Sequence, residues 1–378
     1  MLVEWEKLGI GEQEMLSGLY DEAEVYGVFR PVLSSANLTL KVAYKEVALL
    51  YMHLQHSDTL PRYILTFSDG KSCETIAQLV LDGILEIEYE GKFVSGAAAL
   101  KALYGEMLSD GPATSGRLAV LSMEGIRYAL HLRDLDMRSL SNRLYTFNTI
   151  PWDVQARSKF LSHHSVKVFL FPAAQSETNM LLNKHWQPND SSEEKYWFSW
   201  WKRGESQGQV TANDLPTYKL YISPVISDLP RLLNPVIKVL SSSKAFSFKI
   251  GATLQGLLRP DKMVAYFNNW LEMGQAAAAM SAELNGFTPH GVPFTAQIDD
   301  TGILSWGLDP AETEVLSAIE AGSWRMRVTD HLALAIISAQ TDQLDTKQAL
   351  QFIRAKLYAA GINTEAWAAV NVNEKISS

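Results

Sequence analysis

The order of short elements between residues 215 and 310 constrains the fold more than any other feature of the sequence. Alternating apolar positions predict strands, and apolar residues at helical spacing predict helices. In chain order these elements are the strand "TYKLYIS", the helix "DLPRLLNPVIKVLSSS", the strands "AFSFKIG" and "KMVAYF", the helix "WLEMGQAAAAMSAELN" and a hairpin of "PFTAQID" and "ILSWGL". This order predicts an α+β domain with a mixed sheet and helices packed on one face.

Polar side chains recur on one face of these predicted strands. Side chains alternate between the two faces of a strand, so Lys219 and Tyr221 share a face, and Lys249 lies on the polar face of the next strand. If the apolar faces pack under the helices, the other face gathers these three residues. Arg259 and Lys262 then lie at its edge.

The local charge of this region is opposite to that of the whole chain. Residues 215–270 contain seven Lys or Arg and two Asp or Glu, whereas the chain has a formal net charge of −9. A local reversal of this kind can concentrate an anion. The alternative is a solvated strand face, on which lysines protect the sheet from edge pairing.

Composition excludes several classes of protein. An acidic chain lacks the basic surface of a general nucleic-acid binder, and its 378 residues are enough for two or three cores. One cysteine, Cys73, excludes a disulfide framework and a thiolate metal cluster. The first residues lack the plan of a signal peptide, and the apolar runs are too short to span a bilayer. We therefore expect a cytoplasmic protein without nucleic-acid or membrane partners.

The N-terminal part of the chain predicts a separate module. Residues 1–36 are acidic and predict an arm. Residues 37–110 predict a winged-helix-like module, whose elements are the helix "LKVAYKEVALLYMHLQ", the strand "RYILTF", a helix "KSCETIAQLVLDG" that ends at Gly83, and the hairpin "ILEIEYEGKFVSG". Acidic residues dominate the predicted wing, which favours peptide docking over DNA binding. The stretch "YILTFSDGKSCETIAQLVLDGILEIE" resembles the leader-peptide recognition element of enzymes that modify ribosomal peptides (RiPP biosynthesis).

Residues 111–378 predict the main α+β domain. Before the core motifs, "RLAVLS", "YALHLRDL" and "VKVFLF" predict short strands. A tryptophan-rich stretch, "WFSWW", is either a hydrophobic patch folded onto a neighbouring domain or the lip of a substrate site. After the core motifs, residues 311–378 predict a helical tail that begins with "AETEVLSAIEAG" and whose last helix ends at Gly361.

The motifs "YKLYISP", "FSFKIG", "RPDKMVAYF", "GVPFTAQID" and "ILSWGL" resemble the phospho-Ser/Thr lyase fold. This family includes phosphothreonine lyases of bacterial type III effectors, the lyase domains of class III and IV lanthipeptide synthetases, and stand-alone lyases of class V lanthipeptide and thioamitide pathways. The resemblance implies cofactor-independent β-elimination of phosphate from a phosphorylated precursor peptide, which gives dehydroalanine or dehydrobutyrine. The sequence holds no Gly-rich phosphate loop and no kinase signature, so a separate kinase would have to act first.

The resemblance also implies roles for individual residues. Lys249 matches the family's catalytic lysine, which removes the α-proton, and Lys219 matches a lysine that contacts the phosphate. Arg259 and Lys262 fall where the family supplies further phosphate-binding cations. The family has a histidine as general acid where this chain has Tyr221. Either the Tyr221 phenol donates the proton, or another residue does, or activity is lost.

Three further residues are candidates for the same site. His290 is an alternative proton donor, and Arg325 and Arg327 either reach the phosphate or pair with nearby acids. The histidine pairs of the chain have no accompanying carboxylates or cysteines, so we expect no metal. The sequence therefore predicts a phospho-Ser/Thr lyase. The alternative is a catalytically inactive phosphopeptide- or protein-binding partner, or an effector, on the same fold.

Overall fold

The computed structural model describes residues 2–20, 25–29, 41–54, 70–105, 116–172, 176–189, 196–204, 217–309 and 322–370. Contacts within the chain divide it into two compact units, residues 1–110 and residues 111–378. Each unit has hydrophobic clusters of its own. Among the helices in the described ranges, none is long and apolar enough to cross a bilayer.

The first unit contains a three-stranded antiparallel sheet, a hairpin and several short helices. The sheet has the order β1-β2-β3, and β4 pairs with β5. The strands are β1 (Leu2–Glu4), β2 (Val25–Phe29), β3 (Lys41–Tyr44), β4 (Ile87–Tyr89) and β5 (Lys92–Val94). The helices are η1 (Trp5–Lys7), α1 (Ile10–Tyr20), α2 (Lys45–Leu54), α4 (Gly70–Leu81), η2 (Gly96–Ala99) and α5 (Leu100–Tyr104).

The N-terminal residues belong to the same unit as the predicted module. β2 pairs with β1 on one side and with β3 on the other, and Phe29 packs in a cluster with residues of α2 and α4. This differs from the acidic arm expected for residues 1–36, because apolar residues of β1 and β2, such as Val3 and Val28, bring these strands into the sheet. The expected helix over residues 40–55 begins only at Lys45, since β3 precedes it. The expected strand "RYILTF" lies outside the described residues.

Two turn predictions in this unit are confirmed. Helix α4 is followed by Gly83 in the left-handed conformation, with φ of 71°. The β4–β5 hairpin turns at Glu90 and Gly91, with φ of 50° and 77°. Positive φ at both central residues is the geometry of a two-residue hairpin, for which glycine is well suited.

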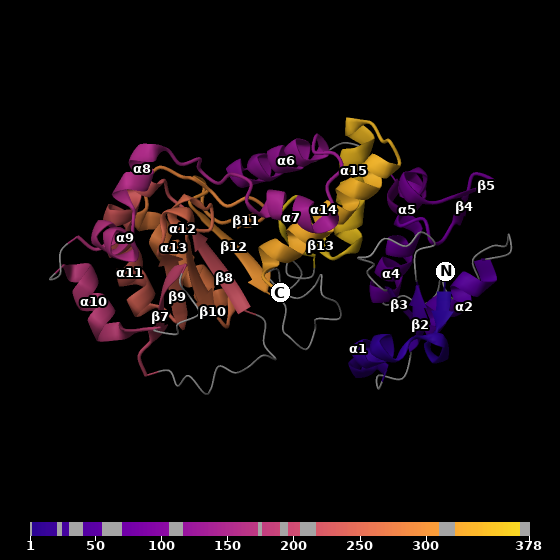
Figure 1. The fold of residues 1–378 in the computed structure, drawn as a ribbon, viewed down its shortest axis with the longest axis horizontal. Helices are drawn as coiled ribbons and strands as arrows, with labels where there is room; N and C mark the ends of the chain where they lie inside the picture. The colour runs from indigo at the N-terminus through magenta and orange to yellow at the C-terminus, as the bar shows by residue number, and fades with distance from the viewer. Residues whose placement is uncertain are drawn as a thin grey trace. The chain divides into compact units, whose positions relative to one another are not determined.

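The second unit is built on a seven-stranded sheet with the order β11-β12-β8-β10-β9-β7-β6 (Figure 1). The α+β class is confirmed, but every described neighbour pair in this sheet is antiparallel, where we expected a mixed sheet. The reason is that β10 lies between β8 and β9, which are parallel to each other and joined through helix α11. The strands are β6 (Trp186–Pro188), β7 (Trp197–Lys202), β8 (Thr217–Ile222), β9 (Ser247–Gly251), β10 (Met263–Phe267), β11 (Ala296–Gln297) and β12 (Leu304–Asp309).

One face of the sheet is apolar and covered by helices. Phe248, Met263 and Ala265 point into a cluster formed with buried residues of these helices, such as Leu233 and Met273. The helices are α9 (His163–Leu170), α10 (Glu177–His185), α11 (Leu229–Ser242) and α13 (Trp270–Glu283). The remaining short helices of this region are α8 (Val154–Lys159), η4 (Ile226–Asp228) and α12 (Leu254–Leu258).

The helices outside the core motifs pack together around a second hydrophobic cluster. Its buried residues come from α6 (Arg117–Leu130), α7 (Met137–Tyr145), α14 (Trp324–Thr341) and α15 (Thr346–Ala359). Helix α14 begins against the other face of the sheet, because a Cβ at Gly307 would lie 2.5 Å from the Trp324 ring. Helices therefore pack on both faces, not only on one. A small hairpin of β13 (Ile362–Asn363) and β14 (Ala368–Ala369) follows α15.

The strand predictions for "RLAVLS", "YALHLRDL" and "VKVFLF" are wrong. The first lies in α6, whose buried residues Leu118, Ser122, Ile126 and Ala129 follow the helical period, and the second covers the end of α6 and the turn that follows it. The third lies in α9, where the Ser162 side chain caps the helix N-terminus. The helices expected after Gly322 are confirmed, and Gly361 has the left-handed φ of 73° expected after a helix end. The "AETEVLSAIEAG" prediction falls on residues 311–322, nearly all outside the described ones.

Candidate active site

The register of the sheet places the predicted polar residues on one face. Lys219 of β8 lies opposite Tyr266 of β10, and Tyr221 of β8 lies opposite Val264. Val264 in turn lies opposite Lys249 of β9. Directly opposed residues of antiparallel strands share a face, so alternation along each strand predicted this arrangement correctly.

Two aromatic rings link three cations on this face. The Nζ atoms of Lys219 and Lys249 lie 5.7 Å and 5.6 Å from the centre of the Tyr266 ring. The Trp197 ring lies 4.7 Å from Lys249 Nζ and 5.3 Å from Arg259 Cζ. The negative face of an aromatic ring attracts a cation at these distances. We call Lys219, Lys249 and Arg259 the cation cluster.

Carboxylates hold the two ends of the cation cluster. Lys219 forms an ion pair with Asp309 at the end of β12. Arg259 donates two hydrogen bonds to Asp261, from Nε and Nη2, each of 2.8 Å. Its Nη2 also donates to the Tyr145 hydroxyl at 3.1 Å, and its guanidinium lies 5.3 Å from the Tyr145 ring centre. The Arg259 side chain is 32% exposed, so its guanidinium is accessible to solvent although Asp261 fixes its position.

Asp261 is the buried centre of this arrangement. Its Oδ2 lies 2.9 Å from Nη1 of Arg325 and accepts a hydrogen bond of 3.2 Å from Tyr145. Burial alone would raise the pKa of Asp261, but Arg325 and Arg259 hold it well below its usual range. The carboxylate is therefore charged, and together with the two arginines it leaves one net positive charge.

Arg325 is buried, and its contacts are those of a residue that stabilises the fold. Its side chain is 1% exposed, and it donates to the backbone carbonyls of Pro293 and Tyr145. The expected alternative of a salt bridge to a nearby acid is the arrangement found. Arg327 lies elsewhere, because its Nη2 donates to the carbonyl of Ala360 just after α15. Residues two apart on a helix point to different sides, so these two arginines do not share a site.

Lys262 is on the same sheet face but in different surroundings. It is fully buried, and its Nζ lies 2.5 Å from Nδ1 of His290 and 3.5 Å from Oγ of Ser223. Burial lowers the pKa of Lys262 to about 7. The pKa of His290 falls to about 4, through burial first and then through the nearby Lys262. The burial of Lys262 against His290 does not favour the phosphate-binding role that we expected of this lysine.

His290 is engaged at both ring nitrogens. Its Nε2 lies 2.7 Å from the carbonyl oxygen of Asn148, which can only accept a hydrogen bond. Nε2 therefore carries the proton, and Nδ1 is the acceptor for Lys262. A histidine held in this way stays neutral and uses its proton to fix the backbone near Asn148, which does not favour the proton-donor role we considered for it.

Tyr221 keeps its proton. Its side chain is 2% exposed and packs with Val264, Val292 and Tyr266. Burial, followed by the charge of Asp309, raises its pKa well above the usual value of 10. A neutral phenol on the face of the cation cluster has the protonation state that a proton donor requires.

Several residues of this site had no signal in the sequence. Tyr145 comes from α7, more than a hundred residues before Arg259, and Asp309 lies at the end of a predicted hairpin. Asp261 could have been found, because "RPD" places a carboxylate two residues after a candidate phosphate cation. The sequence marks Trp197 only as part of the tryptophan-rich stretch "WFSWW".

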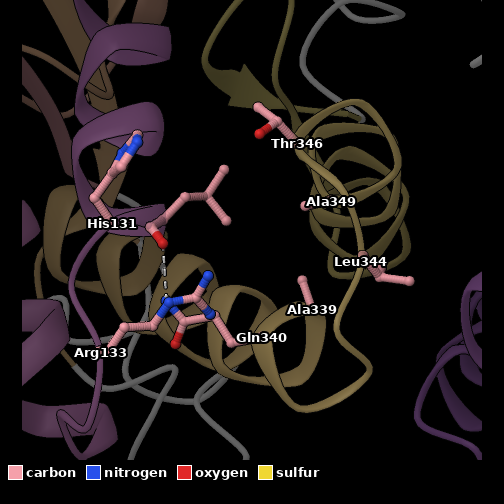
Figure 2. Close-up of a pocket in the computed structure, with 8 residues that line it drawn as sticks. His131, Arg133, Ala339, Gln340, Leu344, Thr346 and Ala349 are labelled. Atoms are coloured by element: carbon pink, nitrogen blue, oxygen red, sulfur yellow. Dashed lines mark hydrogen bonds between the residues drawn. The ribbon is translucent and has the colours of Figure 1, made fainter.

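Other features of the second unit lie apart from this face. A pocket of ≈ 80 Å³ lies between the end of α6 and the connection from α14 to α15, where Gln340 donates to the carbonyl of Leu130 (Figure 2). None of the candidate site residues lines it. Within the described ranges, no group of three or more His, Cys, Asp or Glu is placed to hold a metal ion.

Comparison with known proteins gives several solved structures that are similar to this chain, among them two effector proteins. No protein-family model matches the chain, and no curated protein does. It is similar in structure to the effector protein from Pseudomonas syringae pv. tomato strain DC3000, with a TM-score of 0.39 and 12% identity. The effector protein from Pseudomonas syringae pv. syringae strain 61 gives a TM-score of 0.38 and 14% identity. Each match covers 67% of this chain and 99% of the other. At these TM-scores the likeness leaves function to be argued from the site.

Proposed function

We propose that this chain is a phospho-Ser/Thr lyase that eliminates phosphate from a phosphorylated ribosomal precursor peptide. The observation that carries the proposal is the cation cluster, in which Trp197 and Tyr266 link Lys249 to Arg259 and Lys219. A phosphate group needs several cations at once, and a β-elimination needs a basic group beside them. The cluster brings both kinds of group to one sheet face in an acidic chain.

The reaction assigns one role to each part of the site. As a cation, Lys249 contacts the Trp197 and Tyr266 rings. It acts as the base after giving its own proton to solvent: the neutral amine takes the α-proton of the phosphorylated residue, and the electrons of the broken C–H bond form the Cα–Cβ double bond. The Cβ–O bond breaks, and its electron pair leaves with the phosphate. Arg259 and Lys219 stabilise the negative charge that gathers on the phosphate oxygens. Tyr221 supplies a proton to the departing oxygen, and the product is dehydroalanine or dehydrobutyrine.

Asp261 and Asp309 support this mechanism indirectly. Each carboxylate fixes a phosphate cation before the substrate arrives, which lowers the cost of ordering long side chains on binding. The pairing also reduces repulsion among three cations on one face. The Asp261 carboxylate, shared between two arginines, leaves net positive charge for the phosphate.

The first unit supplies a second, independent reason to propose a peptide substrate. Its three-stranded sheet ends in the edge strand β3, and β4 and β5 form a separate hairpin. An edge strand can pair with an extended peptide. In this proposal the first unit binds the unmodified leader of the precursor, a separate kinase phosphorylates the peptide, and the pathway is of the lanthipeptide or thioamitide type.

The decisive experiment combines the purified protein with a phosphothreonine or phosphoserine peptide. We expect release of inorganic phosphate and a peptide that has lost phosphoric acid, with a new alkene that adds a thiol. Hydrolysis would instead return the hydroxyl residue, which adds no thiol. Lys249→Ala is the matched inactive control. If the wild-type protein leaves all such peptides unchanged, the proposed lyase function is wrong.

The alternative function is a phosphopeptide-binding protein without turnover. The observation in its favour is Tyr221, a strongly buried phenol where the resembling family has a histidine. Tight binding of a phosphopeptide that is recovered unchanged after long incubation would support this alternative.

A further inference from the structure

The Trp197 ring contacts two cations that are ten residues apart in the chain. It is the first residue of β7 and lies opposite Gly251 of β9. The preceding residue anchors the strand, because the Tyr196 carbonyl accepts a 3.0 Å hydrogen bond from the Ala252 backbone. The indole ring then contacts Lys249, which belongs to β9, and Arg259, which follows α12.

The three tryptophans of this strand have different surroundings. Trp200 points to the apolar face and stacks on Phe248, with ring centres 4.8 Å apart. Trp201 lies on the same face as Trp197, four residues further along, and stacks on Phe246 at 6.0 Å. Trp197 differs from both, because its ring contacts two cations, Lys249 and Arg259. The tryptophans of "WFSWW" therefore do not act together, either as one hydrophobic patch or as the lip of a substrate site.

We infer that Trp197 is a positioning residue, which seats the Lys249 amine and the Arg259 guanidinium on one indole and so fixes the spacing between base and phosphate cation. This inference rests on the proposed function. Two like charges repel, but the negative face of an indole attracts both, and a rigid ring fixes their distance from each other. A base that is misplaced by about 1 Å can lose about two orders of magnitude in rate.

The test compares three variants with the wild type. Trp197→Leu removes the aromatic face, Trp197→Phe keeps a smaller one, and Trp201→Leu is the matched control on the same face of the same strand. Thermal unfolding of each variant checks that it is folded. Two readouts are measured, which are kcat for phosphate elimination and the Kd values for a phosphopeptide and for its unphosphorylated form.

We expect Trp197→Leu to lower kcat about tenfold, as for the loss of two modest cation–π contacts. Its Kd for the phosphopeptide should weaken several-fold, with no change in the Kd for the unphosphorylated peptide. Trp197→Phe should recover most of both losses, and Trp201→Leu should stay within about twofold of the wild type. A general packing defect would weaken both peptides equally and would not be rescued by phenylalanine.

The outcomes separate this inference from the proposed function. If Trp197→Leu behaves like Trp201→Leu, or if Trp197→Phe is no better than Trp197→Leu, the inference is wrong although the lyase activity stands. If the wild type binds the phosphopeptide without turnover, the proposed function fails, and the Kd values alone decide the role of Trp197. If the wild type neither binds nor converts it, both are wrong.

Discussion

Lys249 lies in β9 and Lys262 directly precedes the adjacent strand β10, and alternation assigns both to the same face, yet their surroundings are opposite in kind. Lys249 lies over two aromatic rings, beside other cations that are held by carboxylates. Lys262 is fully buried against a neutral histidine, and burial lowers its pKa to about 7. The first lysine belongs to a charged cluster, and the second to a desolvated pair that ties β10 to the backbone near Asn148.

The difference shows that sharing a sheet face does not mean sharing a site. Strand alternation assigns a side chain to a face, but loops from distant parts of the chain decide which part of that face stays open. Here the segment around His290 covers Lys262. The comparison predicts that substitutions at the two lysines separate activity from stability.

The largest expected effect is on turnover. Lys249→Ala should lower kcat for phosphate elimination by at least about 100-fold, because general bases contribute roughly 10² to 10⁴. Lys262→Met, which keeps an unbranched apolar chain, should stay within a few-fold of the wild type. Phosphate release from a phosphopeptide measures both. An equal loss of kcat in the two variants would contradict the assignment of different roles to Lys249 and Lys262.

Breaking the buried ion pair should cost stability. Asp261→Asn leaves the buried Arg325 without a charged partner and should lower the free energy of unfolding by about 3–5 kcal/mol. Glu365→Gln is the control, since Glu365 is 58% exposed in its pair with Arg354 and should cost less than about 1 kcal/mol. Denaturant unfolding measures both variants. A cost for Asp261→Asn no larger than for Glu365→Gln would contradict the central position of Asp261.

Tyr221→Phe tests the proton donor. Because phosphate is a tolerable leaving group, removing the phenol should lower kcat by about 10- to 100-fold with little change in phosphopeptide Kd. Single-turnover kinetics at saturating substrate measure this directly. An unchanged rate would show that the proton comes from another group or from water.

The smallest effect, taken per pH unit, is a slope in stability with pH. The pKa of Lys262 is about 7 when folded, against the usual 10.5, so between these pH values the unfolded chain holds a proton that the folded chain lacks. Stability from this group therefore rises with pH across that window, by up to about 1.4 kcal/mol per pH unit. The free energy of unfolding of Lys262→Met, measured at pH 7 to 10, should lack this contribution. Parallel pH profiles for both proteins would exclude a depressed pKa at Lys262.

Local patterns predicted the strand faces and much of the secondary structure. Alternation placed Lys219, Tyr221 and Lys249 together, and the hairpins and late helices were found from turn residues and helical spacing. The failures concern non-local pairing. A strand-helix-strand order indicates that β8 and β9 are parallel, but it does not reveal that β10 lies between them.

The partners of the cations could not be predicted for the same reason. Tyr145 and Trp197 reach Arg259 from elements far away in the chain, and no local spacing encodes such a meeting. The burial of Lys262 depends on His290, which lies in a loop whose path is set by the sheet. Arg325 and Arg327 look equivalent in sequence, but their directions on α14 separate them.

The insertion of β10 between β8 and β9 has a consequence for how the site forms during folding. Lys219 and Lys249 lie on strands that are not neighbours, and the Tyr266 ring that both contact is on β10. A partly folded sheet without β10 would lack the Tyr266 ring, and the two ammonium groups would then have no shared contact that holds them near each other. The cation cluster is therefore complete only when β10 has paired with both β8 and β9, and phosphate binding reports on that pairing.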